Sequence, residues 1–342
     1  MTREKPRNLA ASVRQRLFNL AQERREDFGL VLTKYGLERF LYRLAQSQYR
    51  DQFILKGALL FELWTHRPYR PTRDLDLEGQ GDNSIARIKR LFSEIMTQAV
   101  DDDGLVFDLK SLRVARIKEE QEYEGLRVNL VARLERARIH MQVDVGFGDV
   151  IVPPPKEIQY PALLNFPRPH LRAYPREAVV AEKLEALVKL GMANTRMKDF
   201  YDLWKLSHDF DFDGALLTDA IKSTFKRRGT DVPSDIPLAL TDEFSRDSQK
   251  AKQWQAFLKK SGLDHDQAAL HTVAADLTRF LISPLRAVHD FQKFRLIWPK
   301  GGPWSPANTP GITMRHEGIR PLYRATVGKT LSIKVCFAEL SE

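Results

Sequence analysis

Residues 70–79 read RPTRDLDLEG, and the fold of the chain is built around this stretch. Within it, Leu75 and Leu77 alternate with Asp74 and Asp76, which is the two-residue period of a half-buried strand. The alternation predicts a strand that turns its leucines to a core and its carboxylates to the opposite face. Two carboxylates about 7 Å apart at the backbone on one strand face suit Mg²⁺, which prefers oxygen ligands.

The spacing of this acidic pair is not sufficient to predict a metal site. The Asp-any-Asp pattern occurs five times in the chain, and the pattern alone favours an acidic solvent face of a strand over a metal site. Two other features favour the metal. Lys56, Gly57 and Ala58 form a turn that opens an apolar helix, and Asp144 lies between two valines on a strand-like stretch. Such a turn offers backbone N–H groups to a triphosphate, while three carboxylates hold its metal ions.

The patterns around the acidic pair alternate between helical and strand-like periods. They predict two or three amphipathic helices in residues 8–50, a short turn leading into a buried helix at 53–65, a helix at 84–99 capped by Ser84, strands at 105–117, 125–132 and 138–145, and a hairpin loop at 118–125. This order predicts an α+β fold whose core, from 51 to 174, is a mixed sheet flanked by helices.

Proline density marks a boundary after this core. Residues 152–175 contain seven prolines, which predicts a domain boundary or a wrapping loop without regular structure. Helical periodicity returns from 176 to about 290 and predicts an all-helical domain. The expected domains are N-terminal helices at 1–50, the core at 51–174, the helical domain at 175–292, and a partly disordered tail rich in Pro and Gly at 293–342.

Composition excludes several classes of protein. No apolar run reaches the roughly 18 residues of a membrane span, and the N-terminus does not resemble a signal peptide, so we expect a cytoplasmic location. The single cysteine, Cys336, excludes an internal disulfide. The formal charge is +9, and Lys and Arg outnumber Asp and Glu by 11 to 5 in residues 1–50 and by 8 to 3 in residues 291–342. Basic ends suit a polyanionic partner such as RNA, although they also aid solubility.

Five short motifs together resemble one known family. They are KGALL at 56–60, RPTRDLDL at 70–77, VDV at 143–145, EKL at 182–184 and RMKDFYDL at 196–203. In this order they resemble the AbiEii/AbiGii abortive-infection toxins, which are nucleotidyltransferases of the DNA polymerase β-like superfamily. The resemblance runs from about residue 8 to residue 300 and implies a polymerase β-like nucleotidyltransferase core.

The resemblance also implies roles for individual residues. Lys183 would contact the triphosphate, and Asp199 would orient it or assist proton removal. In this chain Ala58 stands where many members have a second Gly or a Ser, so a hydroxyl contact with phosphate is absent there. The implied catalytic residues are Asp74, Asp76, Asp144 and Asp199, of which the first three bind metal, and the implied nucleotide-binding residues are Lys56, Gly57, Ala58, Arg73, Lys183, Lys198 and Asp202.

Other interpretations of these residues stay open at the level of sequence. Arg70 and Arg73 suit phosphate through their planar guanidinium groups, but Arg73 is as well placed for an ion pair with a neighbouring carboxylate. Asp199 and Asp202, three residues apart on a helix, are equally typical of an ion-pair cluster on a helix surface.

The function implied by the resemblance is transfer of a nucleoside monophosphate from an NTP to an acceptor hydroxyl, with two Mg²⁺ ions. The acceptor would be an RNA end such as that of tRNA, and the protein would be the toxin of a toxin–antitoxin system in phage defence, with a cognate antitoxin encoded nearby. The alternatives are a small-molecule nucleotidyltransferase of aminoglycoside-modifying type and a non-catalytic nucleic-acid-binding protein with the same fold.

Overall fold

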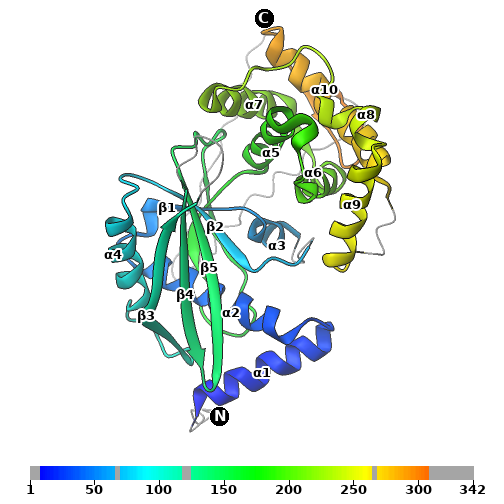
Figure 1. Cartoon of the computed structure of the whole chain (residues 1–342). Helices are drawn as coiled ribbons and strands as arrows, with labels where there is room; N and C mark the ends of the chain where they lie inside the picture. The colour runs from blue at the N-terminus through cyan, green and yellow to red at the C-terminus, as the bar shows by residue number, and fades with distance from the viewer. Residues whose placement is uncertain (1–7, 66–69, 118–124, 264–267, 308–342) are drawn as a thin grey trace, which may run out of the picture.

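The computed structural model describes residues 8–65, 70–117, 125–263 and 268–307. A region of sheet and helices formed by the first half of the chain lies below a mainly helical region formed by the second half (Figure 1). Of the hairpin loop expected at 118–125, only Gly125 belongs to the described residues. Cys336 lies outside them. The division of the chain into four domains stays a prediction.

The helices expected in the first half are present. They are α1 (Leu9–Arg24), α2 (Phe28–Gln46), the short 3₁₀ helix η1 (Arg50–Gln52), α3 (Leu59–Thr65) and α4 (Ile85–Met96). Side chains of Asn8, Asp27 and Ser84 accept backbone N–H groups at the starts of α1, α2 and α4. The predicted cap at Ser84 is therefore confirmed.

One seven-stranded sheet forms the centre of this region. Its strands are β1 (Phe53–Lys56), β2 (Asp74–Gly79), β3 (Leu105–Arg116), β4 (Leu126–Leu134), β5 (Ala137–Phe147), β6 (Lys156–Gln159) and β7 (His170–Ala173). They lie side by side in the order β3-β4-β5-β2-β1-β7-β6. The pairs β2/β5 and β1/β7 are parallel and the others antiparallel, so the predicted mixed sheet is confirmed.

Two local predictions about this sheet are wrong. Residues 53–56 form strand β1 and not a turn, because Phe53, Ile54 and Leu55 are buried between β2 and β7. The proline-rich segment is also not free of regular structure, since it supplies β6 and β7. Neither strand contains a proline, so each keeps the N–H groups that pairing needs.

The two faces of the sheet have different environments. On β5, Ile139, Met141, Val143 and Val145 are buried, while the residues between them are at least partly exposed. Helix α2 packs on the buried face so closely that a Cβ at Gly36 would lie 2.6 Å from the sulfur of Met141. The acidic residues of β2 and β5 therefore lie on the face opposite α2.

The second half is mainly helical but not entirely so. Its helices are α5 (Arg176–Leu190), η2 (Gly191–Ala193), α6 (Met197–Asp209), α7 (Gly214–Arg228), η3 (Leu238–Leu240), α8 (Asp242–Ser245), α9 (Ser248–Lys260) and α10 (Leu270–His289). A small sheet, in the order β10-β9-β8, joins β8 (Phe212–Asp213), β9 (Leu296–Trp298) and β10 (Ser305–Pro306). The prediction of an all-helical domain is wrong in this respect.

The first part of the expected tail is packed against the helices. The indole N–H of Trp298 donates to the carbonyl of Ser207 at 2.7 Å, and that of Trp304 donates to the carbonyl of Phe280 at 2.8 Å. Aromatic burial therefore fixes residues 296–304. Residues 308–342 lie outside the described part, so the partly disordered tail stays a prediction.

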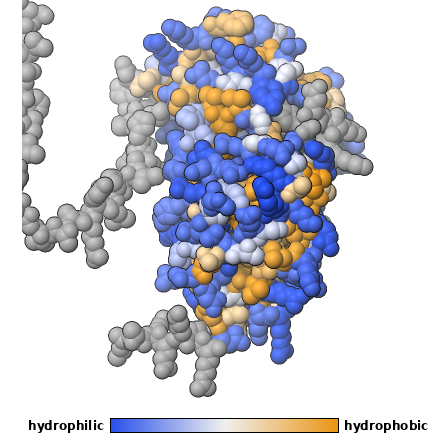
Figure 2. Space-filling view, turned by 90° about the vertical axis from the view of Figure 1, so that its left-hand side faces the viewer, coloured by the Kyte–Doolittle hydropathy of each residue, from blue (hydrophilic) through white to orange (hydrophobic). Residues whose placement is uncertain are grey.

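The surface gives no sign of a membrane segment among the described residues. None of their helices is long and apolar enough to span a bilayer. The side of the molecule that carries α4 and β3 is mostly hydrophilic, with hydrophobic residues in small groups (Figure 2).

The packing of the last strands predicts that Trp298→Ala lowers the free energy of unfolding. Loss of a fully buried indole leaves a cavity among Phe280 and Trp304, with a cost of roughly 3–5 kcal/mol. Urea denaturation followed by far-UV circular dichroism measures it. Phe291→Ala, at a side chain 90% exposed, is the matched control and should change stability by less than about 0.5 kcal/mol. Equal stability of the two variants would contradict the packing role.

Candidate metal and nucleotide site

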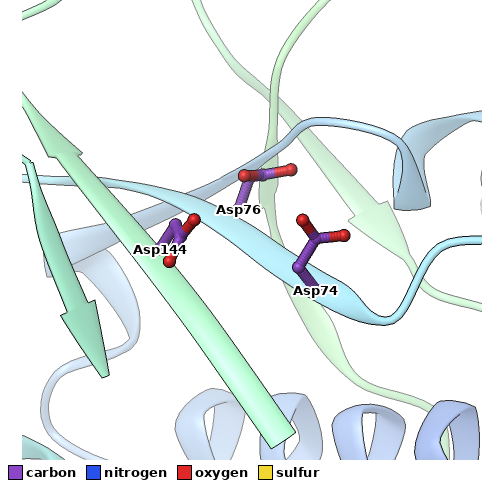
Figure 3. Close-up of side chains that lie close together, drawn as sticks. All are labelled: Asp74, Asp76 and Asp144. Carbon is purple, nitrogen blue, oxygen red and sulfur yellow. The ribbon is translucent and has the colours of Figure 1, made fainter. Parts of the chain in front are cut away.

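Three carboxylates from two neighbouring strands converge on the open face of the sheet. Asp74 and Asp76 come from β2, and Asp144 comes from β5, where parallel pairing places it opposite Asp76 (Figure 3). One oxygen from each carboxylate lies within 4.8 Å of the others. All three are partly exposed, so the group is accessible to a ligand. The structure thus brings together the three residues expected to bind metal.

Neighbouring polar groups fix the orientation of two of these carboxylates. The hydroxyl of Thr72 donates to Oδ1 of Asp74. The amide of Gln142 donates to Oδ2 of Asp144 at 3.2 Å, and the guanidinium of Arg127 donates to both of its oxygens at 2.9 and 2.8 Å. Arg127 was missed by the sequence analysis. Only the antiparallel register of β4 and β5, which pairs Arg127 with Asp144, identifies it.

Gly57 is required by the close approach of the third carboxylate. Its φ is +78°, a conformation that side chains with a Cβ rarely adopt. A Cβ at this position would lie 1.9 Å from Oδ2 of Asp76, which is far closer than atoms can approach. The turn after β1 therefore lies directly against the carboxylate group. The nucleotide-binding role of Gly57 stays a prediction.

The chemistry of the three residues fits a hard divalent cation. Burial and the nearby charge of Asp74 raise the pKa of Asp76 to about 6, because an ionised carboxylate is costly beside another one. A cation that binds the three oxygens removes this cost. Mg²⁺ and similar ions take oxygen ligands and need only one or two protein carboxylates, so the donor set suits them.

A second charged cluster lies on the facing helices. The ammonium of Lys183 on α5 lies 2.6 Å from Oδ1 of Asp199 and 2.9 Å from Oδ2 of Asp202, both on α6. Arg70 donates two hydrogen bonds of 3.0 Å to Asp202. Both aspartates are fully buried, so this is not the surface ion-pair cluster that helix spacing alone also allowed.

The cations of this cluster keep its two aspartates ionised. Burial by itself would raise the pKa of Asp199, but the ammonium of Lys183 and the guanidinium of Arg196 lower it to about 2. Lys183 stays protonated, since Asp199 and Asp202 raise its pKa despite burial. Asp199 is therefore ionised at neutral pH and is a weak base, which favours an orienting role over proton removal.

Lys198 connects the two clusters electrostatically. It is exposed at the start of α6, and its positive charge lowers the pKa of both Asp76 and Asp199. An exposed cation beside the carboxylate group and the Gly57 turn is a suitable ligand for a phosphate. The sequence expectation for Lys198 is consistent with this position.

Lys56, one of the residues expected to bind nucleotide, has other partners. The ammonium of Lys56 lies 2.8 Å from Glu78 and 3.1 Å from Asp149, and Arg228 of α7 lies 3.2 Å from the same Asp149 oxygen. Lys56 thus belongs to a charge network that joins the sheet to the helical region. The sequence motifs do not reveal this network, because its members are far apart in the chain.

Arg73 and Ala58 are the remaining residues expected to bind nucleotide. Arg73 lies 3.7 Å from Asp27 in an exposed ion pair, as the alternative interpretation of the sequence allowed. The carbonyl of Ala58 accepts the N–H of Phe61 at 3.2 Å in the first turn of α3. Contacts of Lys56, Arg73 and Ala58 with a nucleotide stay predictions.

Comparison with known proteins identifies a family and several similar structures, among them two from Helicobacter pylori. The model of the family described as "Nucleotidyl transferase AbiEii toxin, Type IV TA system" matches residues 39–279, more than half of the chain. A candidate nucleotidyltransferase from Helicobacter pylori is similar at 15% identity with a TM-score of 0.42, over 75% of this chain and 93% of that one. JHP933 from Helicobacter pylori is similar at 16% identity with a TM-score of 0.41, over 75% of this chain and 90% of that one. A search of curated proteins found no match.

The close approach at Gly57 predicts that Gly57→Ala removes metal binding while the chain still folds. The new methyl group must displace Asp76, which separates it from the other two carboxylates. Isothermal titration with Mg²⁺ measures the loss, and far-UV circular dichroism checks the fold.

Gly262→Ala is the matched control for this substitution. Gly262 has a φ of +65° with nothing near its Cβ position, so its variant has the backbone strain without the clash. We expect it to lose about 1 kcal/mol of stability and no metal affinity. If the two variants bound Mg²⁺ equally, the steric argument would be wrong.

The raised pKa of Asp76 predicts how Asp76→Asn changes stability with pH. Between the usual pKa of 3.8 and the folded value of about 6, the unfolded state loses its proton first, so the wild type loses stability as pH rises. The Asn variant does not ionise there. In EDTA, its melting temperature should exceed that of the wild type by a few degrees at pH 7.5 and by less at pH 4.5.

Mg²⁺ should reverse this difference in melting temperature between the variant and the wild type at neutral pH. Mg²⁺ is expected to raise the melting temperature of the wild type and to leave that of Asp76→Asn nearly unchanged. Asp101→Asn, at an exposed site, is the control and should behave like the wild type. A stability gain from Mg²⁺ that is equal in all three proteins would argue against a site at Asp76.

Proposed function

This chain belongs to the AbiEii family of nucleotidyl transferase toxins of type IV toxin–antitoxin systems, and from that premise we propose its reaction. An acceptor hydroxyl oxygen attacks the α-phosphorus of an NTP and forms a new P–O bond. The bond from that phosphorus to the oxygen bridging the α- and β-phosphates breaks, and pyrophosphate leaves. We propose an RNA end, such as that of tRNA, as the acceptor.

The observation that carries this proposal is the group of three carboxylates at the Gly57 turn. Asp74, Asp76 and Asp144 would hold the Mg²⁺ that accompanies the NTP. When bound, Mg²⁺ would offset the negative charge that builds up on the phosphates in the transition state. Thr72 and Gln142 keep two of the carboxylates aimed at the common point, so the site is oriented in advance.

Residues on the helical side would bind the triphosphate. The ammonium of Lys183 has three N–H groups, and two of them point to Asp199 and Asp202. The third is available to a phosphate oxygen, and exposed Lys198 adds a second positive charge beside Asp76. We assign to Asp199 the task of orienting Lys183, and we assign loss of the hydroxyl proton to solvent.

The toxin role gives this chemistry a biological setting. Family membership implies a cognate antitoxin, and we propose that nucleotide addition to tRNA, in the cytoplasm during phage defence, is the toxic reaction. An aminoglycoside-type acceptor would instead be modified without RNA. A non-catalytic nucleic-acid-binding protein would transfer nothing.

The metal group predicts that Asp74→Asn abolishes nucleotide transfer. The carboxamide cannot supply the negative charge that draws the metal, so incorporation should fall by about a hundredfold to a thousandfold, on the scale of a lost transition-state contact. The assay incubates pure protein with Mg²⁺, each labelled NTP in turn and total tRNA, and it reads label in the RNA. Growth of cells expressing the variant should recover in parallel.

Asp211→Asn is the matched control, because Asp211 belongs to another Asp-any-Asp pair, just after the C-terminal end of α6. Its oxygen accepts the N–H of Lys300, and the amide oxygen of Asn keeps this bond. Activity should match the wild type. Absence of transfer by the wild type with every NTP, together with absence of metal-dependent NTP binding, would exclude the enzyme.

A further inference from the structure

A basic depression lies beside the carboxylate group on the side away from Gly57. We call it the arginine trough, a cavity of about 690 Å³ between the N-terminal turns of α2 and the strands β3, β4 and β5. Its polar lining includes Arg73, Arg113, Arg138, Asn129, His140 and Gln142. Among the described residues that line it there is no Asp or Glu, so its charged lining side chains are all arginines.

The sheet register makes the trough continuous with the metal site. Gln142 lines the trough and also donates to Asp144, and Arg73 directly precedes Asp74. Strand β2 begins to pair with β5 only at Gln142, so residues 137–141 of β5 have β4 on one side and open space toward α2 on the other. The trough occupies this open space.

The geometry of the reaction assigns the two substrates to opposite sides of β2. In nucleotidyl transfer the attacking oxygen and the leaving pyrophosphate lie roughly in line on opposite sides of the α-phosphorus. Gly57 follows β1 and contacts Asp76 from the β1 side of β2, and this is where the triphosphate would bind. The attacking hydroxyl then comes from the opposite side, which is the side of β5 and the trough.

On this basis, and resting on the proposed function, we propose that the arginine trough binds the phosphate backbone of the acceptor RNA next to its reactive end. Guanidinium groups match phosphate oxygens in geometry and charge. The lining has no Phe, Tyr or Trp among the described residues, so the trough holds the backbone and does not stack the bases. A cationic aminoglycoside would be repelled by the same surface.

The arginines are accessible to a ligand in this structure. The side chain of Arg73 is 75% exposed, and its ion pair with exposed Asp27 is weak enough for a phosphate to replace it. Arg113 and Arg138 are exposed too. Nη1 of Arg113 donates to the carbonyls of Lys110 and Leu112 at 2.8 and 2.9 Å, which holds the guanidinium over the trough and leaves its other N–H groups for phosphate.

The test compares the wild type with the double variant Arg113→Gln/Arg138→Gln, using the full chain and total tRNA as the probe. In the transfer assay, KM for RNA should rise on the order of tenfold or more, while KM for the NTP stays unchanged. The slope of log affinity against log salt should become shallower by about 0.7 for each arginine removed. Arg113→Lys/Arg138→Lys keeps the charges and should restore most of the affinity.

Arg246→Gln is the matched control, since Arg246 is 61% exposed on the helical region and far from the trough in the fold. It should leave both KM values unchanged. An unchanged KM for RNA in the double variant would overturn the inference, and so would an equal rise in both KM values. Loss of neutralisation by the antitoxin with unchanged RNA affinity would assign the trough to that protein instead.

Direct tRNA binding separates this inference from the proposed function. Binding is measured in EDTA by fluorescence anisotropy, where no turnover occurs. If the wild type transfers no nucleotide, the proposed function fails, yet weaker tRNA binding by the double variant would still support the trough. If transfer is normal and the double variant binds tRNA like the wild type, the trough is wrong and the function stands.

Discussion

Mutual repulsion among three carboxylates is the constraint on which the rest of this structure depends. Asp74, Asp76 and Asp144 lie close enough to share one cation, and they are held there by the parallel pairing of β2 with β5. That pairing is stable because the alternate residues, Leu75 and Val143 among them, are buried on the other face. Hydrophobic burial on one face of the sheet thus supplies the free energy that keeps like charges together on the other.

Positively charged side chains lie around this carboxylate group, some in direct contact with an aspartate and others acting through space. Arg127 is bound directly to Asp144, Lys198 acts on Asp76 through space, and Lys183 with Arg70 neutralises the aspartates of α6. The buried aspartates of α6, Asp199 and Asp202, are paired with cations, which is the condition under which buried charge is tolerated. A triphosphate that enters between these cations and the carboxylates would meet groups already oriented for it, so little reorganisation is needed on binding.

The same ion pairs connect the sheet to the helices. Arg70, just before β2, binds Asp202 on α6, and Asp149, just after β5, binds Arg228 on α7. The residues proposed to bind the nucleotide therefore come from both regions, while the arginine trough is lined by the sheet, α2 and Arg73, which directly precedes β2. This division suits the proposed two-substrate reaction, in which the acceptor and the NTP would be held by separate surfaces that meet at the carboxylates.

The sequence by itself determined the strand of Asp74 and Asp76, most of the helices, the mixed sheet and the three carboxylates that meet at the site. These follow from local periods and short motifs, which act within a few residues of the chain. Tertiary structure alone decided that residues 53–56 and two segments of the proline-rich stretch are strands, that residues 296–304 pack, and that Arg127 faces Asp144. It also joined Arg73, Arg113 and Arg138 in one trough. Each of these depends on strand register and on contacts between distant segments, and no local pattern encodes which distant segment will be the neighbour.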